Sequence, residues 1–399
     1  MNDSKPTSSR ILSIDIMRGM TLFLMLFVND LFEPGVPAWL VHTKARVDGM
    51  GLADWVFAGF LFMVGMSIPY AIGSRMKSGE TKLKVFLHIL LRTASLLLIG
   101  VFMLNSGRLN SGLSGISSEL YAILMYVFIF LIWNKYPGNA KLQKLFLGLK
   151  ILGVIGLTVL ASIFKAGVPG HVTWFITSWW GILGLIGWGY LVAATACLFI
   201  GPKLLPTFVL WLLFIVINIF SQLGMLGFLK FLNPVFGVIV DGNVPMIVLS
   251  GLVISLFMKQ SSFDRRKTVA FIIGFGVLSM AFGFFLRNWF IISKILGTPS
   301  WGMICNGISM MVFAILFWII DIQDKTKWAA VFKPAGQNSL TTYLAPDILY
   351  FAIWGLSLPL FFYKQESSQL LAVGGSLVWA FAMVGLTALL AKINIRLKL

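Results

Sequence analysis

Residues 11–33 read ILSIDIMRGMTLFLMLFVNDLFE, an almost continuous apolar run that decides how the rest of the chain is interpreted. A helix needs about 20 largely apolar residues to cross the hydrocarbon core of a bilayer. The charged side chains lie toward the two ends, with Asp15 and Arg18 near the start and Asp30 and Glu33 near the finish. The run is therefore predicted to be a transmembrane helix rather than a cleaved signal peptide, whose apolar part is shorter and precedes a small-residue cleavage site.

Apolar runs of similar character recur along the whole chain. Eleven more are predicted near residues 52–73, 84–104, 118–133, 145–163, 180–200, 206–220, 244–258, 268–287, 301–321, 336–357 and 371–391. The fourth, seventh and eighth segments of the series are short, so we expect about 10–12 transmembrane helices in an all-α, polytopic membrane helix bundle. A single transmembrane domain is expected over 11–391, flanked by cytoplasmic tails at 1–10 and 392–399.

Composition is typical of a chain embedded in lipid. Of the 399 residues, 58% are hydrophobic and 11% are charged, and the mean hydropathy is +0.92. Soluble domains carry roughly 25% charged residues, so this chain has too few to cover a globule with charge. The formal net charge of +17 would favour nucleic acid in a soluble protein, but here the positions of the basic residues indicate orientation in a membrane, and no nucleic acid partner is expected.

Basic residues alternate between the two ends of successive segments. With the N-terminus in the cytoplasm, the inner loops collect most of the lysines and arginines. The outer side holds only Lys44, Arg46, Arg108, Lys165, Lys230, Arg287, Lys294 and Lys364. Cytoplasmic loops of membrane proteins carry such an excess of basic residues. Both termini are therefore predicted to be cytoplasmic. The long loops fall on the outer side, where any chemistry would have the most room.

Ionisable groups at membrane depth are costly, so they point to functional positions. Asp15 and Arg18 are three residues apart, share a helix face and can form an ion pair. An ion pair with only a structural role at the end of a helix would have the same spacing. Arg92 lies a turn or two into the third segment, again near the cytoplasmic side. Because guanidinium groups match phosphate oxygens, Arg18 and Arg92 are candidates for binding an anionic ligand.

A second group of polar residues is expected at the outer ends of the first two segments. His42 lies in the loop between them, with Asn29 before it and Asp54 after it. An isolated histidine is more often solvated or hydrogen-bonded, but imidazole is also the side chain best suited to proton transfer near neutral pH. Cys197 and Cys305 lie in separate segments without the spacing of a metal site, so no metal is expected.

The eleventh segment opens with FKPAGQNSLTTY at residues 332–343. Pro and Gly ahead of Asn338 and Ser339 are typical of the start of a helix, where free N–H groups favour an anion. Ordinary helix capping explains the same residues.

These motifs, in this order, resemble the heparan-alpha-glucosaminide N-acetyltransferase family, part of a larger group of transmembrane acyltransferases. The pieces that carry the resemblance are Ser13-x-Asp15-x-x-Arg18-Gly19, Phe27-Val28-Asn29, His42, Gly51-Leu52-Ala53-Asp54-Trp55-Val56-Phe57, Phe60-Leu61-Phe62-Met63-Val64-Gly65, Arg92-x-x-x-Leu96-x-x-x-Gly100 and Gly336-Gln337-Asn338-Ser339-Leu340-x-x-Tyr343. The match is dense over about the first hundred residues and sparse but ordered beyond them.

The resemblance implies that an acetyl group passes from cytosolic acetyl-CoA, a co-substrate, to the amine of a glucosamine on the far side of the membrane. It implies that His42 deprotonates this amine or carries the acetyl group transiently, with Asn29 orienting the imidazole or donating to the oxyanion. Charge and depth favour the arginines as ligands of the CoA phosphates. The candidate positions are Arg18, Arg92, Asn338 and Ser339 for acetyl-CoA, and Asp15, Asp54 and Tyr343 for support. A homodimer is also implied.

The sequence departs from the family in three places, the first of which is a spacing between His42 and Asp54 that is two residues longer than in the family. Residues 115–121 read GISSELY where the family carries Gly-x-Leu-Gln-Arg, and Ala345-Pro346-Asp347 replaces a later histidine. The expected acceptor is therefore an amino sugar from the cell envelope or from glycan breakdown, and the expected location is a bacterial inner membrane. A transporter of a small solute or glycan is the alternative, because twelve apolar segments without a soluble domain are ordinary for that class.

Overall fold

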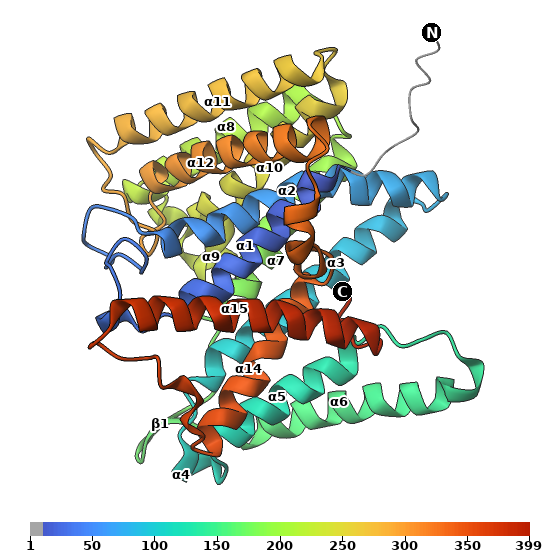
Figure 1. The fold of residues 1–399 in the computed structure, drawn as a ribbon, viewed down its shortest axis with the longest axis vertical. Helices are drawn as coiled ribbons and strands as arrows, with labels where there is room; N and C mark the ends of the chain where they lie inside the picture. Colours follow the sequence, from blue (N-terminus) through green and yellow to red (C-terminus); the bar gives the residue numbers. More distant parts are fainter. Residues whose placement is uncertain (1–10) are drawn as a thin grey trace.

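The structure is a computed structural model that describes residues 11–399. The tail predicted at 1–10 lies outside the described residues. The chain folds as an all-α bundle in which most of the long helices run in a common direction (Figure 1). Within residues 11–399, ten helices are long and apolar enough to cross a membrane. The prediction of a polytopic membrane helix bundle is thus confirmed, and the chain is an integral membrane protein.

Each of the twelve predicted segments corresponds to one helix. These are α1 (Leu12–Asp30), α2 (Leu52–Lys77), α3 (Lys82–Ser106), α5 (Ser118–Trp133), α6 (Gln143–Ile163), α7 (Gly181–Phe199), α8 (Leu204–Gln222), α10 (Asn243–Gln260), α11 (Arg265–Leu286), α12 (Pro299–Phe317), α14 (Ser339–Gly355) and α15 (Gln369–Lys392). Shorter elements are α4 (Ser111–Ser114), α9 (Asn233–Asp241), α13 (Lys333–Gln337) and a hairpin of β1 (Ala166–Val168) and β2 (His171–Thr173). With 16 and 17 residues, α5 and α14 are shorter than the ten long helices.

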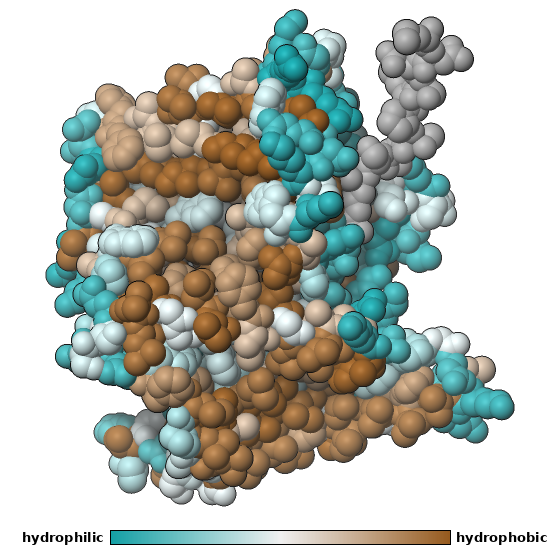
Figure 2. Space-filling view, in the orientation of Figure 1, coloured by the Kyte–Doolittle hydropathy of each residue, from teal (hydrophilic) through white to brown (hydrophobic). Residues whose placement is uncertain are grey.

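The described chain begins and ends at the same edge of the bundle (Figure 1). The end of α2 and the start of α3 meet at this edge and bring Arg75, Lys77, Lys82 and Lys84 to it. We call it the basic edge and the other one the opposite edge. Figure 2 shows an apolar band between these two hydrophilic edges, as expected of a bundle that lies across a bilayer.

The helices divide into an inner and an outer set. In the most apolar stretch of α2, 72% of the residues are buried inside the protein, whereas in the stretch that contains α6 only 22% are. Because both helices are strongly apolar, the exposed apolar side chains of α6 require lipid around them. The inner set includes α1, α2, α7, α10 and α12.

Two glycines let α2 and α10 cross at backbone contact. A Cβ on Gly65 would lie 1.9 Å from the backbone oxygen of Val248, and a Cβ on Gly251 would lie 2.0 Å from that of Phe62. Small residues at helix crossings permit this close approach in membrane bundles. The crossing fixes α2, which carries Asp54 near the opposite edge and Arg75 at the basic edge.

The chain after α15 is packed against the bundle rather than extended from it as a tail. The backbone N–H of Leu397 donates to Thr341 Oγ1 at 2.8 Å, and that of Lys398 donates to the Trp133 carbonyl at 2.9 Å. Leu397 is buried. This segment covers the basic-edge ends of α5 and α14, an arrangement that the predicted tail at 392–399 did not include.

Candidate functional site

A cavity of about 620 Å³ lies among α1, α2, α3, α7, α13 and α14 and extends to the basic edge. Its deeper wall is apolar and includes Leu22, Met25, Phe60 and Leu183. Cavities of this size hold small molecules and cofactors in other proteins.

The wall nearer the basic edge is positively charged. It carries four basic side chains, Arg18, Arg75, Arg92 and Lys398, and one acidic side chain, Glu80. A concave surface lined by one sign of charge attracts ligands of the opposite sign. The cavity is therefore suited to a ligand with an anionic end and an apolar end.

Arg18 is held in a network that joins three helices. Its Nε donates to the Gly336 carbonyl at 2.7 Å, Nη1 donates to Ser67 Oγ at 3.2 Å, and Nη2 pairs with Asp15 Oδ1 at 2.7 Å. The backbones also touch, since a Cβ on Gly336 would lie 2.0 Å from the Asp15 carbonyl oxygen. Two motifs more than 300 residues apart in sequence are thus packing partners. Arg18 lines the cavity and also fixes α13 against α1.

Arg92 is differently placed. Its guanidinium lies 4.7 Å from the ring centre of Tyr190, and its buried Nε has no hydrogen-bond partner among the described residues. Buried polar groups are normally paired, and an unpaired one calls for an explanation. Because Arg92 also lines the cavity, its guanidinium is a candidate contact for an anionic ligand there.

Only some of the residues at the start of α14 line the cavity. Ser339 and Tyr343 line it, and Ser339 Oγ donates to the Gly336 carbonyl at 3.2 Å. Asn338 lines a neighbouring hollow of about 500 Å³ instead, together with Lys333 and Arg396. The structure therefore gathers Arg18, Arg92, Ser339 and Tyr343 around one space and leaves Asn338 beside it.

Several polar residues of the cavity, among them Arg75, His88 and Lys398, were not predicted as site residues from the sequence. Arg75 Nη1 pairs with Glu80 at 3.0 Å, and Arg75 Nη2 lies 2.9 Å from His88 Nε2. Arg75 and His88 both lie close in sequence to the predicted turn between the second and third segments, and this position indicates that their side chains can meet. Lys398 reaches the cavity only because the end of the chain folds back, and no local pattern indicates that.

His42 lies at the opposite edge, in the loop of residues 31–51 that we call the His42 loop. Its Nδ1 is 2.7 Å from Asp54 Oδ1, and Asp54 is 1% exposed whereas the imidazole remains accessible. A carboxylate only accepts hydrogen bonds, so Nδ1 carries the proton and Nε2 is left as the basic nitrogen. This carboxylate–imidazole pair is suited to acid–base chemistry.

The start of α2 builds this pair from local sequence. Asp54 Oδ2 accepts hydrogen bonds from the backbone N–H groups of Thr43 at 3.0 Å and Gly51 at 2.9 Å. A Cβ on Gly51 would lie 2.0 Å from the Val41 carbonyl oxygen, so only glycine fits there. The motif Gly51-Leu52-Ala53-Asp54 therefore both begins the helix and holds the His42 loop.

Lys294 is a third member of this centre that the sequence did not reveal. It lies in residues 287–298, which connect α11 to α12 and which we call the Lys294 loop. Its Nζ is 3.4 Å from His42 Nδ1, and burial lowers the pKa of its ammonium group.

Asn29 belongs to a pocket that His42 does not line. No hydrogen bond between described residues joins the two, and Asn29 lines a small pocket of about 60 Å³ with Tyr343 and Asp347. Asp347 accepts a 2.5 Å hydrogen bond from Tyr126 Oη. Tyr343 lines both this pocket and the 620 Å³ cavity, so its side chain lies between the two spaces.

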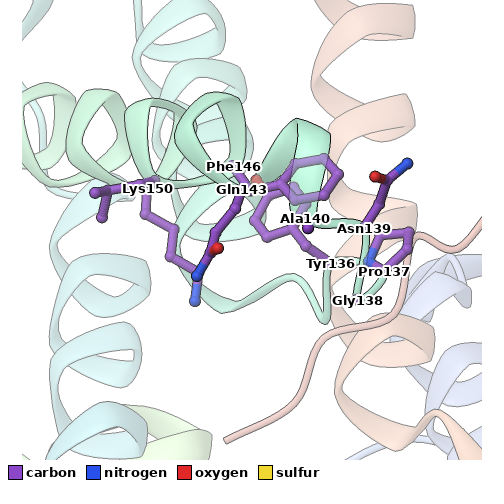
Figure 3. Close-up of a pocket in the computed structure, with 9 residues that line it drawn as sticks. Tyr136, Pro137, Gly138, Asn139, Ala140, Gln143, Phe146 and Lys150 are labelled. Atoms are coloured by element: carbon purple, nitrogen blue, oxygen red, sulfur yellow. The ribbon is translucent and has the colours of Figure 1, made fainter.

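Another hollow, of about 550 Å³, is formed by the chain between α5 and α6 (Figure 3). The ring of Tyr136 stacks on Phe146 with centroids 4.7 Å apart, and Lys150 Nζ lies 5.9 Å from the Tyr136 ring centre. Most of its lining residues are exposed, and none is a predicted site residue. It is a surface groove of the outer helix set rather than the candidate site.

Comparison with known proteins yields a family profile and two curated relatives. The profile described as "Domain of unknown function (DUF5009)" matches residues 10–174. The heparan-alpha-glucosaminide N-acetyltransferase of Mus musculus is 28% identical over 153 residues, which cover 35% of this chain and 22% of the relative. The Homo sapiens protein of the same name is 28% identical over 162 residues, which cover 41% of this chain and 20% of the relative.

The chain spans about a fifth of the length of these curated relatives. The profile match contains Arg18, Asn29, His42, Asp54 and Arg92. Asn338, Ser339 and Tyr343 lie beyond it, although α13 packs on the Arg18 motif. These matches show that the chain is related to the heparan-alpha-glucosaminide N-acetyltransferase family.

Proposed function

We propose that this protein is a transmembrane acyltransferase that moves an acetyl group from cytosolic acetyl-CoA to an amine of a glucosamine-type amino sugar on the outer side. The observation that carries the proposal is the 620 Å³ cavity, with its basic wall at one edge and its apolar wall deeper in the bundle. The positive-inside rule assigns the basic edge to the cytoplasm. The same α1 and α2 that line the cavity lead to Asn29 and His42 at the opposite edge.

The cavity residues fit the chemistry of acetyl-CoA. Arg92, Arg75 and Lys398 line the cavity and would supply cationic groups for phosphates. The apolar wall suits the pantetheine arm and the acetyl group. Bound acetyl-CoA supplies an activated thioester, and every other function must come from the side chains.

The transfer needs a base on the acceptor side. As the acceptor amine attacks the thioester carbonyl carbon, a C–N bond forms, the C–S bond breaks, and the amine loses a proton. His42 Nε2 takes that proton, because Nδ1 is fixed as a donor to Asp54. An acetyl group carried transiently on His42 is the other route, and rapid-quench detection of acetylated His42 distinguishes the two.

The acceptor, the role of Asn29 and the location of the protein are part of the same proposal. The name of the two relatives supports an amino sugar as acceptor, and Asn29 would assist His42 when substrate is bound. A bacterial inner membrane is the proposed location. The homodimer implied by the resemblance remains a prediction, and analytical ultracentrifugation in detergent tests it.

The test is the release of CoA from acetyl-CoA by the full chain in proteoliposomes, with and without glucosamine. We expect release that requires the amine, falls at least about 100-fold in His42→Ala, and is unchanged in His171→Ala, whose histidine is exposed in the β1–β2 hairpin at the same edge. CoA release that is the same with and without glucosamine, or full activity of a folded His42→Ala protein, contradicts the proposal. Uptake of labelled glucosamine without CoA release would support a transporter instead.

A further inference from the structure

The contact between Lys294 and His42 joins two loops that are 252 positions apart in sequence. Besides its 3.4 Å approach to His42 Nδ1, Lys294 Nζ lies 3.4 Å from the Ala53 carbonyl oxygen and 5.8 Å from the ring centre of Phe57. The ammonium group is thus directed at the start of α2, where Asp54 is located, rather than into solvent.

The position of Lys294 is fixed by the loop around it. Asp48 Oδ1 accepts the Ile292 N–H at 2.8 Å, and the Gly49 N–H donates to the Ile292 carbonyl at 3.0 Å. Ser293 Oγ donates to the Ala45 carbonyl at 2.8 Å. These bonds clamp the Lys294 loop onto the His42 loop immediately before Lys294, so its approach to His42 is built into the fold.

The charges at this centre explain why a cation is needed. The Asp54 carboxylate is almost completely buried, and its negative charge acts on the Lys294 ammonium group. Isolated buried charges are very costly, whereas a neighbouring opposite charge offsets that cost. Lys294 supplies this charge from the facing loop.

The other ionisable groups around Lys294 do not replace it. Cys305 of α12 interacts with it electrostatically and is fully buried. The ion pair of Arg287 and Asp48, at 2.8 Å, lies on the same two loops and is neutral in itself. The net charge of His42, Asp54 and Lys294 is therefore zero when the imidazole is neutral.

We infer that Lys294 is a positioning residue that balances the charge of Asp54 and so sets the pH range over which His42 can accept a proton. A cation beside an imidazole opposes its protonation, whereas a lone carboxylate favours it. Without Lys294, Asp54 would hold His42 protonated to higher pH. The consequence for turnover rests on the proposed function, but the consequence for His42 itself does not.

The experiment measures how the modification of His42 by diethyl pyrocarbonate depends on pH. This reagent reacts with neutral imidazole. Mass spectrometry distinguishes modified His42 from modified His88 and His171. Lys294→Met should move the pH of half-maximal reactivity upward by about one unit. Lys294→Arg keeps the charge and should stay within about 0.3 units of wild type. Lys44→Met, an exposed lysine on the His42 loop, is the control and should change nothing.

An unchanged midpoint in folded Lys294→Met overturns the inference, as does a midpoint displaced by a full unit in Lys294→Arg. If Lys294→Met does not fold, Lys294→Gln serves as the neutral variant, and Lys294→Arg still tests the inference independently. The acid limb of the pH–rate profile for CoA release should move with the same sign. A shifted midpoint in a protein that releases no CoA would refute the proposed function and support the charge balance.

Discussion

The cavity at the basic edge and the His42 centre at the opposite edge are built in different ways. The cavity is wide and is formed by side chains from six helices, with most of its charges on one wall. The His42 centre is compact, and short hydrogen bonds within and between two loops hold it at the start of α2. A wide, charged cavity is suited to binding, whereas a small set of fixed donors and acceptors is suited to proton transfer.

The difference predicts separable effects of mutation. Changes in the cavity should alter the affinity for the acetyl donor, and changes at the His42 centre should alter the rate of the chemical step. If substitutions in both regions moved the same kinetic constant, the division of labour between the two edges would be wrong.

The largest effect is expected for Asp54→Asn. The amide nitrogen of asparagine is a donor, so the variant no longer provides two accepting oxygens for Thr43, Gly51 and His42 together. We expect kcat for CoA release to fall by roughly 100-fold or more with little change in the KM for acetyl-CoA. Glu33→Gln, which changes an exposed carboxylate of the His42 loop, is the matched control. A kcat within a few-fold of wild type in folded Asp54→Asn would remove the carboxylate from the mechanism.

A second prediction concerns the binding side. Arg92→Met removes a guanidinium from the cavity wall, so the KM for acetyl-CoA should rise by roughly 10-fold or more, which corresponds to one lost charged hydrogen bond. Arg108→Met is the control, because Arg108 follows the opposite-edge end of α3, the same helix that carries Arg92 near the basic edge. Equal effects of the two substitutions would argue against a donor site at the basic edge.

These two regions also differ in how well the sequence predicts them. His42 and Asp54 are 12 residues apart, and the glycine before the α2 start marks the turn that joins them, so their pairing follows from local sequence. The twelve helices were likewise predicted, because length and apolarity are properties of each segment alone. Helix boundaries agree within a few residues for the same reason.

Contacts between distant segments could not be predicted in this way. Lys294 and Lys398 carry no local signal, since each reaches its site only through the packing of loops and chain ends. Asn29 shares a pocket with Tyr343 and Asp347, a contact that its position in the sequence does not indicate. The direction in which a helix end points depends on its neighbours, and no single-sequence pattern records that.

The third prediction tests the packing that shapes the cavity. Gly336→Ala places a methyl group where only 2.0 Å separates it from the Asp15 carbonyl oxygen, so α13 must move away from α1. We expect a loss of roughly 1–3 kcal/mol in stability, typical of overpacking, together with a higher KM because the Arg18–Gly336 hydrogen bond is disturbed. Thermal unfolding in detergent measures the first effect. Gly374→Ala in α15 is the control, since its Cβ would meet nothing within 4 Å.

The smallest effect concerns the clamp between the His42 loop and the Lys294 loop. The Ile292 N–H and Arg287 stabilise the Asp48 carboxylate and hold its pKa below the ordinary value of 3.8. A carboxyl whose pKa is lowered in the folded state adds stability above its ordinary pKa and loses that contribution as the pH falls through the lower, folded value. Asp48 is partly exposed, so the contribution is small. Wild type should therefore have a slightly higher Tm than Asp48→Asn at neutral pH, and the two Tm curves should converge below about pH 3.8. A Tm difference that persists unchanged into acid would show that the clamp depends on the shape of the side chain rather than on its charge.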